Sequence, residues 1–310
     1  MTRAGFAAVI GAPNAGKSTL VNRLVGSKVT IVTQKAQTTR FPVRGVAIEG
    51  ESQIVLVDTP GIFRPRRRLD RAMVRAAWSG AQDADAIVHL VDAEAELAAA
   101  EPKPKAADKL AAEDVRTVVE GLKRAGRQAI LALNKIDRVR RDALLGLTNR
   151  LFESGAYTEV FMISALDGSG VDDLKRRLAE LMPEGPWLYP EDQAADLPTR
   201  LLAAEITREK VYLRVHEELP YSASVETTAF EERKDGSARI EQSIYVEREG
   251  QRAILIGKGG RTLKWIGEAA RKELAEILGR PVHLFLTVKV RETWAEERST
   301  YADLGLDFDV

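Results

Sequence analysis

The 310-residue chain contains no cysteine, which excludes disulfides, thiolate metal sites and a cysteine nucleophile. Its three histidines, His89, His216 and His283, do not cluster in the sequence and predict no histidine metal centre. No apolar run approaches the roughly 20 residues that a membrane-spanning helix needs. The first apolar strand begins within the first ten residues, so we expect no targeting segment and a cytoplasmic location.

The chain also has no excess of positive or negative charge, because 46 basic residues balance 46 acidic ones. Bulk charge therefore does not indicate a nucleic-acid-binding protein, and any such surface must be local. The two halves differ, with net charge +6 over residues 1–182 and −6 over residues 183–310. The length and this asymmetry predict two domains.

The most informative segment that is present reads GAPNAGKS, from Gly11 to Ser18, directly after the apolar run Phe6–Ile10. A strand followed by GxxxxGKS predicts a phosphate-binding loop. The glycines of this loop let backbone N–H groups point at phosphate oxygens. Its lysine is expected to reach the terminal phosphates and to act as a catalytic residue, and its serine hydroxyl to bind Mg²⁺. The predicted phosphate-binding residues are Gly11, Asn14, Ala15, Gly16, Lys17, Ser18 and Thr19, joined by Asp58 and Gly61 of the next motif.

A second apolar strand, Ile54–Val57, ends in Asp58-Thr59-Pro60-Gly61, which fits a DxxG motif. Asp58 is expected to hold Mg²⁺, and Gly61 to offer its backbone N–H to the terminal phosphate. Before this strand, Gln37–Arg40 is predicted to form a first switch segment that orders over the γ-phosphate. Thr39 is our predicted Mg²⁺ ligand and catalytic residue there, with Thr38 as the alternative.

Two further strand ends predict the base. Ala129–Leu133 runs into Asn134-Lys135-Ile136-Asp137, an NKxD motif whose Asp137 carboxylate would accept hydrogen bonds from guanine N1–H and N2–H₂. Adenine lacks this donor pair and would leave the carboxylate unpaired. Val160–Ile163 runs into Ser164-Ala165-Leu166, where a backbone N–H would reach the guanine carbonyl oxygen. Because ligands of open α/β sheets bind at the carboxyl ends of strands, these motifs together predict GTP and GDP binding with Mg²⁺.

One expected side chain is absent. Many regulatory GTPases place a glutamine after DxxG to orient the attacking water, whereas this chain has Ile62. Backbone groups, a cation or a partner would have to position the water instead. Asn14 either helps to bind K⁺ near the phosphates or is a solvated loop residue.

The first half, residues 1–182, is predicted to be a doubly wound sheet whose last helix is Val171–Met182, with apolar Val171, Leu174, Leu178 and Leu181. A proline-rich linker follows at 183–198. Residues Glu94–Ala107 are predicted to be a surface insertion before a helix that begins near Lys109. The basic run Arg64–Arg75 is either a solvated loop face or a nucleotide-gated contact to RNA or a partner.

The second half, residues 199–310, is predicted to run helix–strand–strand–helix–helix–strand, starting with a helix over Pro198–Glu217. Strands are expected near Ser222–Arg233, Ala238–Arg248 and Val282–Val290. Between two short helices lies a GxxG loop, typical of a KH domain, in which glycines let a nucleic-acid backbone approach and lysine and arginine contact phosphates. The predicted RNA contacts are Ile256, Gly257, Lys258, Gly259, Gly260, Arg261 and Lys264.

With these motifs in hand, nearly the whole chain resembles the Era family, through GAPNAGKST, KAQTTR, VDTPGIF, NKID, ELPYSASVE, IYVEREGQRAILIGKGG and PVHLFLTVKVRETW. The resemblance implies a P-loop GTPase domain followed by an α+β type II KH domain. It also implies binding to the 3′ end of small-subunit ribosomal RNA and help in assembling the small ribosomal subunit. The departures are the insertion and an acidic tail that ends in Asp307-Phe308-Asp309-Val310.

We therefore expect a monomeric GTP-hydrolysing switch that reports its nucleotide state to an RNA-binding domain. The alternative is a non-enzymatic RNA-binding assembly factor that holds GTP structurally, an alternative that Ile62 leaves open. Peripheral contact with a membrane is also left open, although no lipidation motif or amphipathic anchor supports it.

Overall fold

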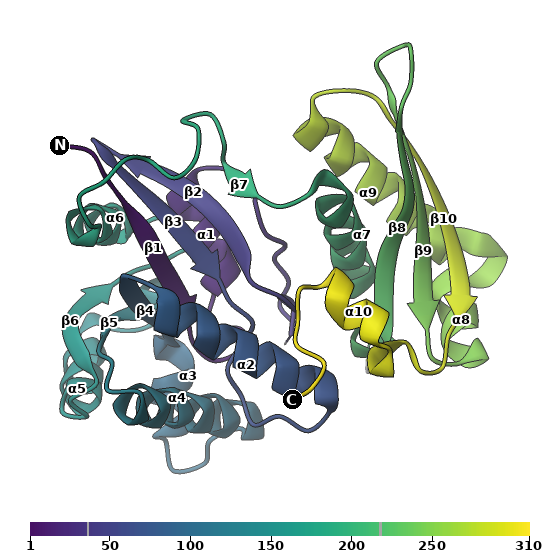
Figure 1. The fold of residues 1–310 in the computed structure, drawn as a ribbon. Helices are drawn as coiled ribbons and strands as arrows, with labels where there is room; N and C mark the ends of the chain where they lie inside the picture. The colour runs from purple at the N-terminus through teal and green to yellow at the C-terminus, as the bar shows by residue number, and fades with distance from the viewer. Residues whose placement is uncertain (36, 217–218) are drawn as a thin grey trace. The chain divides into compact units, whose positions relative to one another are not determined.

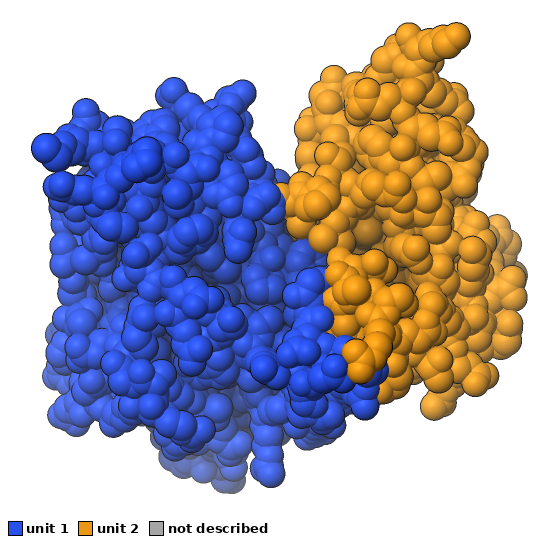
Figure 2. Space-filling model, viewed as in Figure 1, with its two compact units in different colours: residues 1–30, 39–196, 304–310 blue, residues 31–38, 197–303 orange. Residues whose placement is uncertain are grey.

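The computed structural model describes residues 1–35, 37–216 and 219–310. By internal contacts the chain divides into two compact units, which are coloured separately in Figure 2. Unit 1 comprises residues 1–30, 39–196 and 304–310, and unit 2 comprises residues 31–38 and 197–303. Within the described ranges, no helix has the length and apolarity required to cross a membrane.

Unit 1 is built on a seven-stranded sheet with the strand order β6-β5-β4-β1-β3-β2-β7. Strands β1, β3, β4, β5 and β6 pair in parallel, whereas β2 is antiparallel to both β3 and β7. The parallel strands β1, β3, β4 and β5 are almost continuously apolar because helices cover both faces of the sheet. The strand bounds are β1 Arg3–Ile10, β2 Val43–Glu49, β3 Ser52–Asp58, β4 Ala86–Asp92, β5 Ala129–Asn134, β6 Tyr157–Met162 and β7 Ala195–Asp196.

Helices close a separate apolar core on each face of this sheet (Figure 1). Helices α1 and α6 pack on one face, and α2, α4 and α5 pack on the other. This arrangement is the predicted doubly wound sheet, and it brings the carboxyl ends of β1, β3, β4 and β5 to one edge. The helix bounds are α1 Lys17–Val25, α2 Arg68–Asp83, α3 Ala93–Ala99, α4 Ala106–Arg124, η1 Ile136–Arg138, α5 Arg141–Phe152 and α6 Val171–Leu181.

Three local predictions about unit 1 were wrong. The segment Glu94–Ala107 is not a plain surface insertion, because most of its first half belongs to helix α3, which is N-capped by the Asp92 carboxylate accepting from the Ala95 N–H at 3.1 Å. Helix α4 consequently begins at Ala106 rather than near Lys109. Helix α6 ends one residue early, so Leu181 is partly exposed and Met182 is buried in the core instead.

Residues 183–196 contact the unit 1 sheet from the start of β1, where Glu184 bridges to Arg3, to β2. Ala195 and Asp196 form β7 against β2. The Gln53 side chain donates to the Tyr189 carbonyl at 2.8 Å and accepts from the Leu188 and Tyr189 N–H groups at 2.8 and 3.0 Å. This part of the proline-rich segment is therefore held by specific hydrogen bonds rather than free.

Unit 2 has the predicted order helix–strand–strand–helix–helix–strand around a three-stranded sheet, β10-β9-β8. Strand β9 is antiparallel to β8 and parallel to β10. One core joins α7, α8 and α9 to the sheet through Val211, Leu255 and Ile266. The bounds are α7 Thr199–Arg214, η2 Leu219–Ser222, β8 Ala223–Glu232, β9 Ala238–Val246, α8 Glu249–Ile256, η3 Lys258–Gly260, α9 Arg261–Leu278, β10 Val282–Val290, η4 Trp294–Glu296 and α10 Arg298–Asp303.

Two predicted details of unit 2 also differ. Helix α7 ends at Arg214, and the predicted end at Glu217 lies outside the described residues. Of the two helices beside the GxxG loop, only α8 is short, because α9 continues for 18 residues to a left-handed Gly279. The strand predicted at Val282–Val290 is present as β10, and its alternate side chains His283, Phe285, Thr287 and Lys289 are exposed.

Residues 31–38 join unit 2 although they lie between segments of unit 1. Ile31 is buried in a core with Ala203 and Ile206 of α7. The Val32 N–H donates to the Glu209 carboxylate at 2.9 Å, and the Lys35 ammonium donates to main-chain carbonyls at the end of α7. The segment just before Thr39 is therefore packed on the first helix of unit 2.

Candidate functional site

The phosphate-loop residues stand where β1 ends and α1 begins. Gly11 and Gly16 have φ values of +153° and +100°, and a Cβ at either position would lie 2.4 Å from another atom, the Leu90 carbonyl oxygen or the Asn134 amide nitrogen. Glycine is therefore required at both positions. Helix α1 starts at Lys17 with no side-chain cap, so its first N–H groups are available to an anion.

Lys17 is buried beneath this loop. Its ammonium donates to the Ala12 carbonyl at 2.8 Å and to the Gly11 carbonyl at 3.2 Å. Burial lowers the pKa of Lys17 to about 8, against the opposing attraction of the Asp58 carboxylate. A bound phosphate would therefore stabilise the charged form of the buried Lys17 ammonium.

Three hydroxyl groups converge on one carboxylate oxygen. Asp58 Oδ2 accepts from Ser18 Oγ at 2.7 Å, from Thr30 Oγ1 at 2.9 Å and from Thr39 Oγ1 at 3.2 Å. The other oxygen, Oδ1, is buried and has no hydrogen-bond partner within the part of the chain that the structure describes. Burial raises the pKa of Asp58, whereas the bonds from Ser18, Thr30 and Thr39 and the nearby Lys17 oppose the rise.

This oxygen cluster fits Mg²⁺. Carboxylate and hydroxyl oxygens are hard ligands of the kind that Mg²⁺ takes, usually together with phosphate oxygens and water. The unpartnered Oδ1 of Asp58 needs a cation or a donor to offset its burial. Ser18, Thr39 and Asp58, the three predicted metal ligands, are therefore brought together.

Thr38, the alternative to Thr39, faces other groups. Its hydroxyl lies 2.6 Å from Thr33 Oγ1 and donates to the Lys35 carbonyl at 2.8 Å. All three residues belong to the segment 31–38. This geometry favours Thr39 as the switch residue.

Ile62 and Asn14 bear on how water is positioned. The Ile62 side chain is fully buried in the core with Ala8 and Ile10, and its main-chain N–H donates to the Gly11 carbonyl at 3.0 Å. It orients no water. Asn14 is exposed at φ +63°, a left-handed conformation that asparagine tolerates, so its amide is open to solvent or to a cation.

The predicted base-recognition residues are linked through Asn134. Its amide nitrogen donates to the Ala15 carbonyl at 2.7 Å, and its amide oxygen accepts from the Ala165 N–H at 2.9 Å. Asn134 therefore fixes the phosphate loop against the loop that begins at Ser164. The Ala165 N–H is engaged by Asn134 here, and the neighbouring Leu166 side chain is 67% exposed.

Lys135 and Asp137 follow on the same turn. Lys135 has φ +64° and pairs with the Asp92 carboxylate. The Asp137 carboxylate is partly exposed, with its Oδ2 3.9 Å from Arg138 Nε. The Asp137 carboxylate is thus accessible to a ligand.

Sequence reasoning missed two residues of this site. Thr30 shares Asp58 Oδ2 with the predicted ligands, and Asp92 pairs with Lys135. Asp92 was detectable, because it ends an apolar strand at the same sheet edge as the motifs. Thr30 carries no comparable signal, because it lies in an irregular segment far from Asp58 in the sequence.

His89 packs against Tyr157 in the interior of unit 1. Its Nδ1 lies 2.9 Å from the Tyr157 hydroxyl, and the two rings stack with centroids 5.8 Å apart. Complete burial lowers the pKa of His89 to about 3, so it stays neutral.

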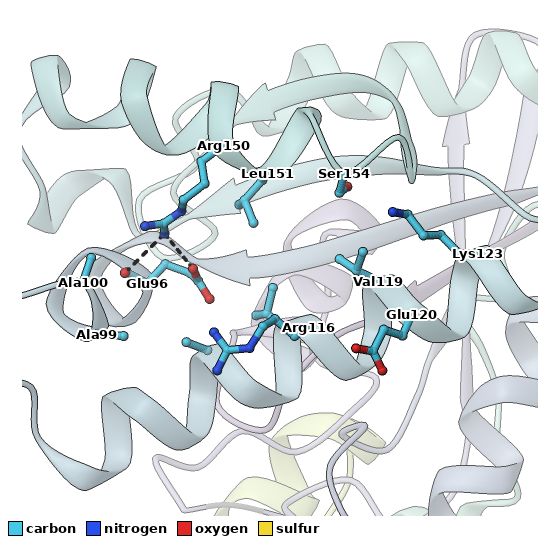
Figure 3. Close-up of a pocket in the computed structure, with 12 residues that line it drawn as sticks. Glu96, Ala99, Ala100, Arg116, Val119, Glu120, Lys123, Arg150, Leu151 and Ser154 are labelled. Carbon is cyan, nitrogen blue, oxygen red and sulfur yellow. Dashed lines mark hydrogen bonds and ion pairs between the residues drawn. The ribbon is translucent and has the colours of Figure 1, made fainter.

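A cavity of about 500 Å³ lies between α3, α4 and α5 (Figure 3). Arg150 donates to the buried Glu96 carboxylate at 2.9 Å on its wall, and Arg116 lies opposite. Burial raises the pKa of Glu96, and Arg150 opposes the rise. None of the nucleotide motifs lines this cavity, so the nucleotide site is elsewhere.

The GxxG loop of unit 2 connects α8 to α9. Gly257, Gly259 and Gly260 all have positive φ, between +61° and +74°. A Cβ on Gly257 would lie 2.3 Å from Thr262 Oγ1, whereas Gly259 and Gly260 face open space. Gly257 is thus needed for the turn itself, and the other two leave the backbone bare on the outside.

Cationic and apolar side chains surround this loop. Lys258, Arg261 and Lys264 are exposed, and Ile256 is half-buried. Two exposed apolar side chains, Ile254 at 59% and Trp265 at 38%, were missed as candidates. The guanidinium of Arg214 lies 5.4 Å from the Trp265 ring centre, and such a ring is a suitable platform for a base.

Comparisons with known proteins match both halves of the chain. A family model described as a 50S ribosome-binding GTPase matches residues 6–135, and a KH domain model matches residues 218–295. GTPase Era of Caulobacter vibrioides is 72% identical over 309 residues, which cover 100% of this chain and 98% of that protein. GTPase Era of Maricaulis maris is 63% identical over 308 residues, with 99% and 98% covered.

Solved structures agree as well. A variant of Aquifex aeolicus Era bound to GDP and AlF₄⁻ is 38% identical, with a TM-score of 0.88 over 98% of this chain and 99% of that one. Era in complex with MgGDPNP and nucleotides 1506–1542 of 16S ribosomal RNA gives the same identity, coverage and TM-score. With its P-loop GTPase and KH folds both present, the chain belongs to the Era family of GTPases.

Proposed function

We propose that this chain binds the 3′ end of 16S ribosomal RNA through its GxxG loop and couples that binding to GTP hydrolysis in unit 1. The observation that carries the proposal is the 38% identical Era complex, which holds MgGDPNP and RNA nucleotides 1506–1542 together. Along the sequence we assign residues 1–182 to the GTPase domain, 183–198 to the linker and 199–310 to the KH domain. By packing, residues 31–38 join unit 2, whereas residues 183–196 and 304–310 join unit 1. A cytoplasmic monomer that assists assembly of the small ribosomal subunit is the expected context.

The proposed chemistry is attack of water on the γ-phosphate of GTP. Lys17, which rests on loop carbonyls, turns its ammonium to the phosphates and offsets the charge that develops there. Bound Mg²⁺ supplies further positive charge to the phosphate oxygens, and Ser18, Thr39 and Asp58 would hold it. Gly61 offers its N–H, and its lack of a side chain is required, because a Cβ would lie 2.9 Å from Pro13.

Guanine would be read by Asp137, with Asn134 and Lys135 shaping the pocket. Asn134 contributes by fixing the loops that begin at Gly11 and Ser164. The fully buried Ile62 supplies no water-orienting amide, so K⁺ held beside Asn14 is the proposed substitute.

The segment 31–38 is the proposed route of communication. Thr39 lies next to Ser18 and Asp58, whereas residues 31–38 pack on α7 of the KH-containing unit. Arg208 of α7 is buried, pairs with Glu205 and donates to the Thr38 carbonyl. A change in Thr39 on γ-phosphate loss would therefore act on a segment that the RNA-binding unit holds.

Multiple-turnover phosphate release tests whether the chain is an enzyme. We expect steady release over many cycles, abolished by Lys17→Ala at protein concentrations that still show a folded thermal transition. A single burst that stops at one phosphate per protein would instead support an assembly factor that holds GTP structurally.

A further inference from the structure

The outer face of α2 is basic. Leu69, Ala72, Met73 and Ala77 bury the inner face of this helix. Arg71 and Arg75 lie one turn apart on the outer face, and both are exposed. They continue the basic run, in which Arg64, Arg66 and Arg67 are exposed as well.

The final residues Leu304–Val310, here called the tail, cover this face. They belong to unit 1, as α2 does, and Leu306 anchors them as a buried side chain. Asp307 Oδ2 lies 3.1 Å from Arg75 Nη1, and Phe308 lies under the Arg68 guanidinium at 4.3 Å from its ring centre. Figure 1 shows the yellow end of the chain beside α2.

Main-chain oxygens complete the contact. Arg71 Nε donates to the Val310 oxygen at 3.4 Å, and Arg75 Nη1 donates to the Asp309 oxygen at 3.4 Å. In the Arg75–Asp307 ion pair, the Arg75 side chain is 61% exposed and the Asp307 side chain is 50% exposed. Exposed pairs of this kind are weak, so a stronger polyanion can replace them.

The tail presents the chemical pattern of a single nucleic-acid strand. An anion, an aromatic ring and a second anion follow one another as Asp307, Phe308 and Asp309. Arginine takes the same partners in RNA, because its planar fork binds phosphate oxygens and its flat face stacks on bases. The surface is part of the half of the chain with net charge +6, and a strand held by the KH domain would be at high local concentration.

We propose that the Arg68–Arg71–Arg75 face of α2 is a second binding surface for single-stranded RNA, and that the tail covers it as an internal competitor. This goes beyond the proposed function, because the surface is separate from the GxxG loop. It also gives the basic run and the acidic tail, two features that the GTPase and KH motifs leave unexplained, a common role.

The test uses the full-length protein with the GxxG loop silenced by Lys258→Asp and Gly259→Asp, so that RNA bound elsewhere is visible. The probe is a fluorescent 12-nucleotide oligouridylate, titrated with GDP-bound protein at several salt concentrations. Removal of residues 307–310, which leaves the anchor Leu306, should increase affinity about tenfold and steepen the salt dependence by about two phosphate contacts. Adding Arg71→Glu and Arg75→Glu should remove this gain.

Matched variants make the result specific. Arg140→Glu with Arg141→Glu changes two exposed arginines of the same unit and should preserve the gain. If the truncated chain shows a lowered thermal transition, Asp307→Asn, Phe308→Ala and Asp309→Asn in the intact chain should give the same gain. No gain in either form, a gain that survives Arg71→Glu and Arg75→Glu, or an equal gain for polyglutamate would overturn the proposal, the last in favour of an acidic protein partner.

Discussion

The hydroxyl oxygens of Ser18 and Thr39 lie 2.9 Å apart, and both hydroxyls donate to the same oxygen of Asp58. Three segments that are distant in the sequence thus bring hydroxyl and carboxylate oxygens together at the phosphate loop. Thr39 is also the first residue of unit 1 after the segment 31–38, which belongs to unit 2 and packs on α7.

Thr39→Ala should lower kcat for GTP hydrolysis by on the order of 10²-fold, because one oxygen ligand and its preorganised position are lost. Thr38→Ala is the matched control, since its hydroxyl bonds within its own segment, to Thr33 and Lys35. Single-turnover hydrolysis across a Mg²⁺ titration measures both. A larger loss for Thr38→Ala would contradict the assignment of Thr39.

Asp137→Asn should reduce GTP affinity by about 10⁴-fold and create affinity for xanthosine triphosphate, whose additional carbonyl accepts from an amide. Asp142→Asn alters an exposed carboxylate of the same unit, paired with Arg140, and should change neither affinity. Competition binding with the two nucleotides decides between the outcomes. Retained tight GTP binding by Asp137→Asn would remove Asp137 from the base site.

K⁺ should accelerate hydrolysis relative to Na⁺, because the buried Ile62 leaves water positioning and charge neutralisation to other groups. Asn14→Ala should remove the difference between the two salts while leaving GDP affinity within about twofold. Equal rates in K⁺ and Na⁺ for the parent protein would make Asn14 a solvated loop residue.

Nucleotide affinity should fall as pH rises above 8. Burial lowers the pKa of Lys17 from 10.5 to about 8 in the free protein, and phosphate raises it again on binding. Binding above pH 8 therefore takes up a proton, and the Kd for GDP should rise by up to about tenfold per pH unit. Guanosine is the control, since it carries the same base without phosphate, and an identical slope for guanosine would contradict the role of Lys17.

The lowered pKa of Lys17 has the opposite effect on the stability of the nucleotide-free protein: its free energy of unfolding should increase with pH, whereas nucleotide affinity decreases. In the unfolded chain Lys17 has its ordinary pKa of 10.5, whereas in the folded chain its pKa is about 8. The contribution of Lys17 to the free energy of unfolding should thus increase as pH rises between these values. Denaturant titrations of the parent and Lys17→Met proteins would reveal this difference in slope.

Much of the site was predictable because its residues end apolar strands. Asp58 and Asn134 follow buried runs, and parallel strands deliver such ends to one edge. Thr30 was not predictable, because irregular segments carry no periodicity that places a side chain. The helical start of the insertion was not predicted because Ala- and Glu-rich composition also occurs in surface loops. The N-cap residue Asp92 is the sequence signal that marks the start of α3.

The position of residues 31–38 was also beyond sequence reasoning. Sequence order assigns them to the GTPase half, whereas Ile31 and Lys35 make their contacts with α7. Tertiary packing decides such a placement, and no local pattern records it. The docking of the tail on α2 escaped prediction for the same reason.

RNA binding by the GxxG loop tests the central claim most directly. Lys258→Asp with Gly259→Asp places two carboxylates on the bare loop and keeps Gly257, whose substitution would strike Thr262. Arg271→Ala with Lys272→Asp gives the same charge change farther along α9 and serves as the control. The measurement is the affinity of each folded protein for the 3′-terminal segment of 16S ribosomal RNA, with GTP affinity determined on the same sample.

We predict a loss of at least about 100-fold in RNA affinity for the loop variant, little change for the control and unchanged GTP affinity for both. Lys258→Ala alone should reduce the salt slope by about one contact. Full RNA affinity in the loop variant would contradict the claim that the KH loop is the principal site at which this chain recognises ribosomal RNA.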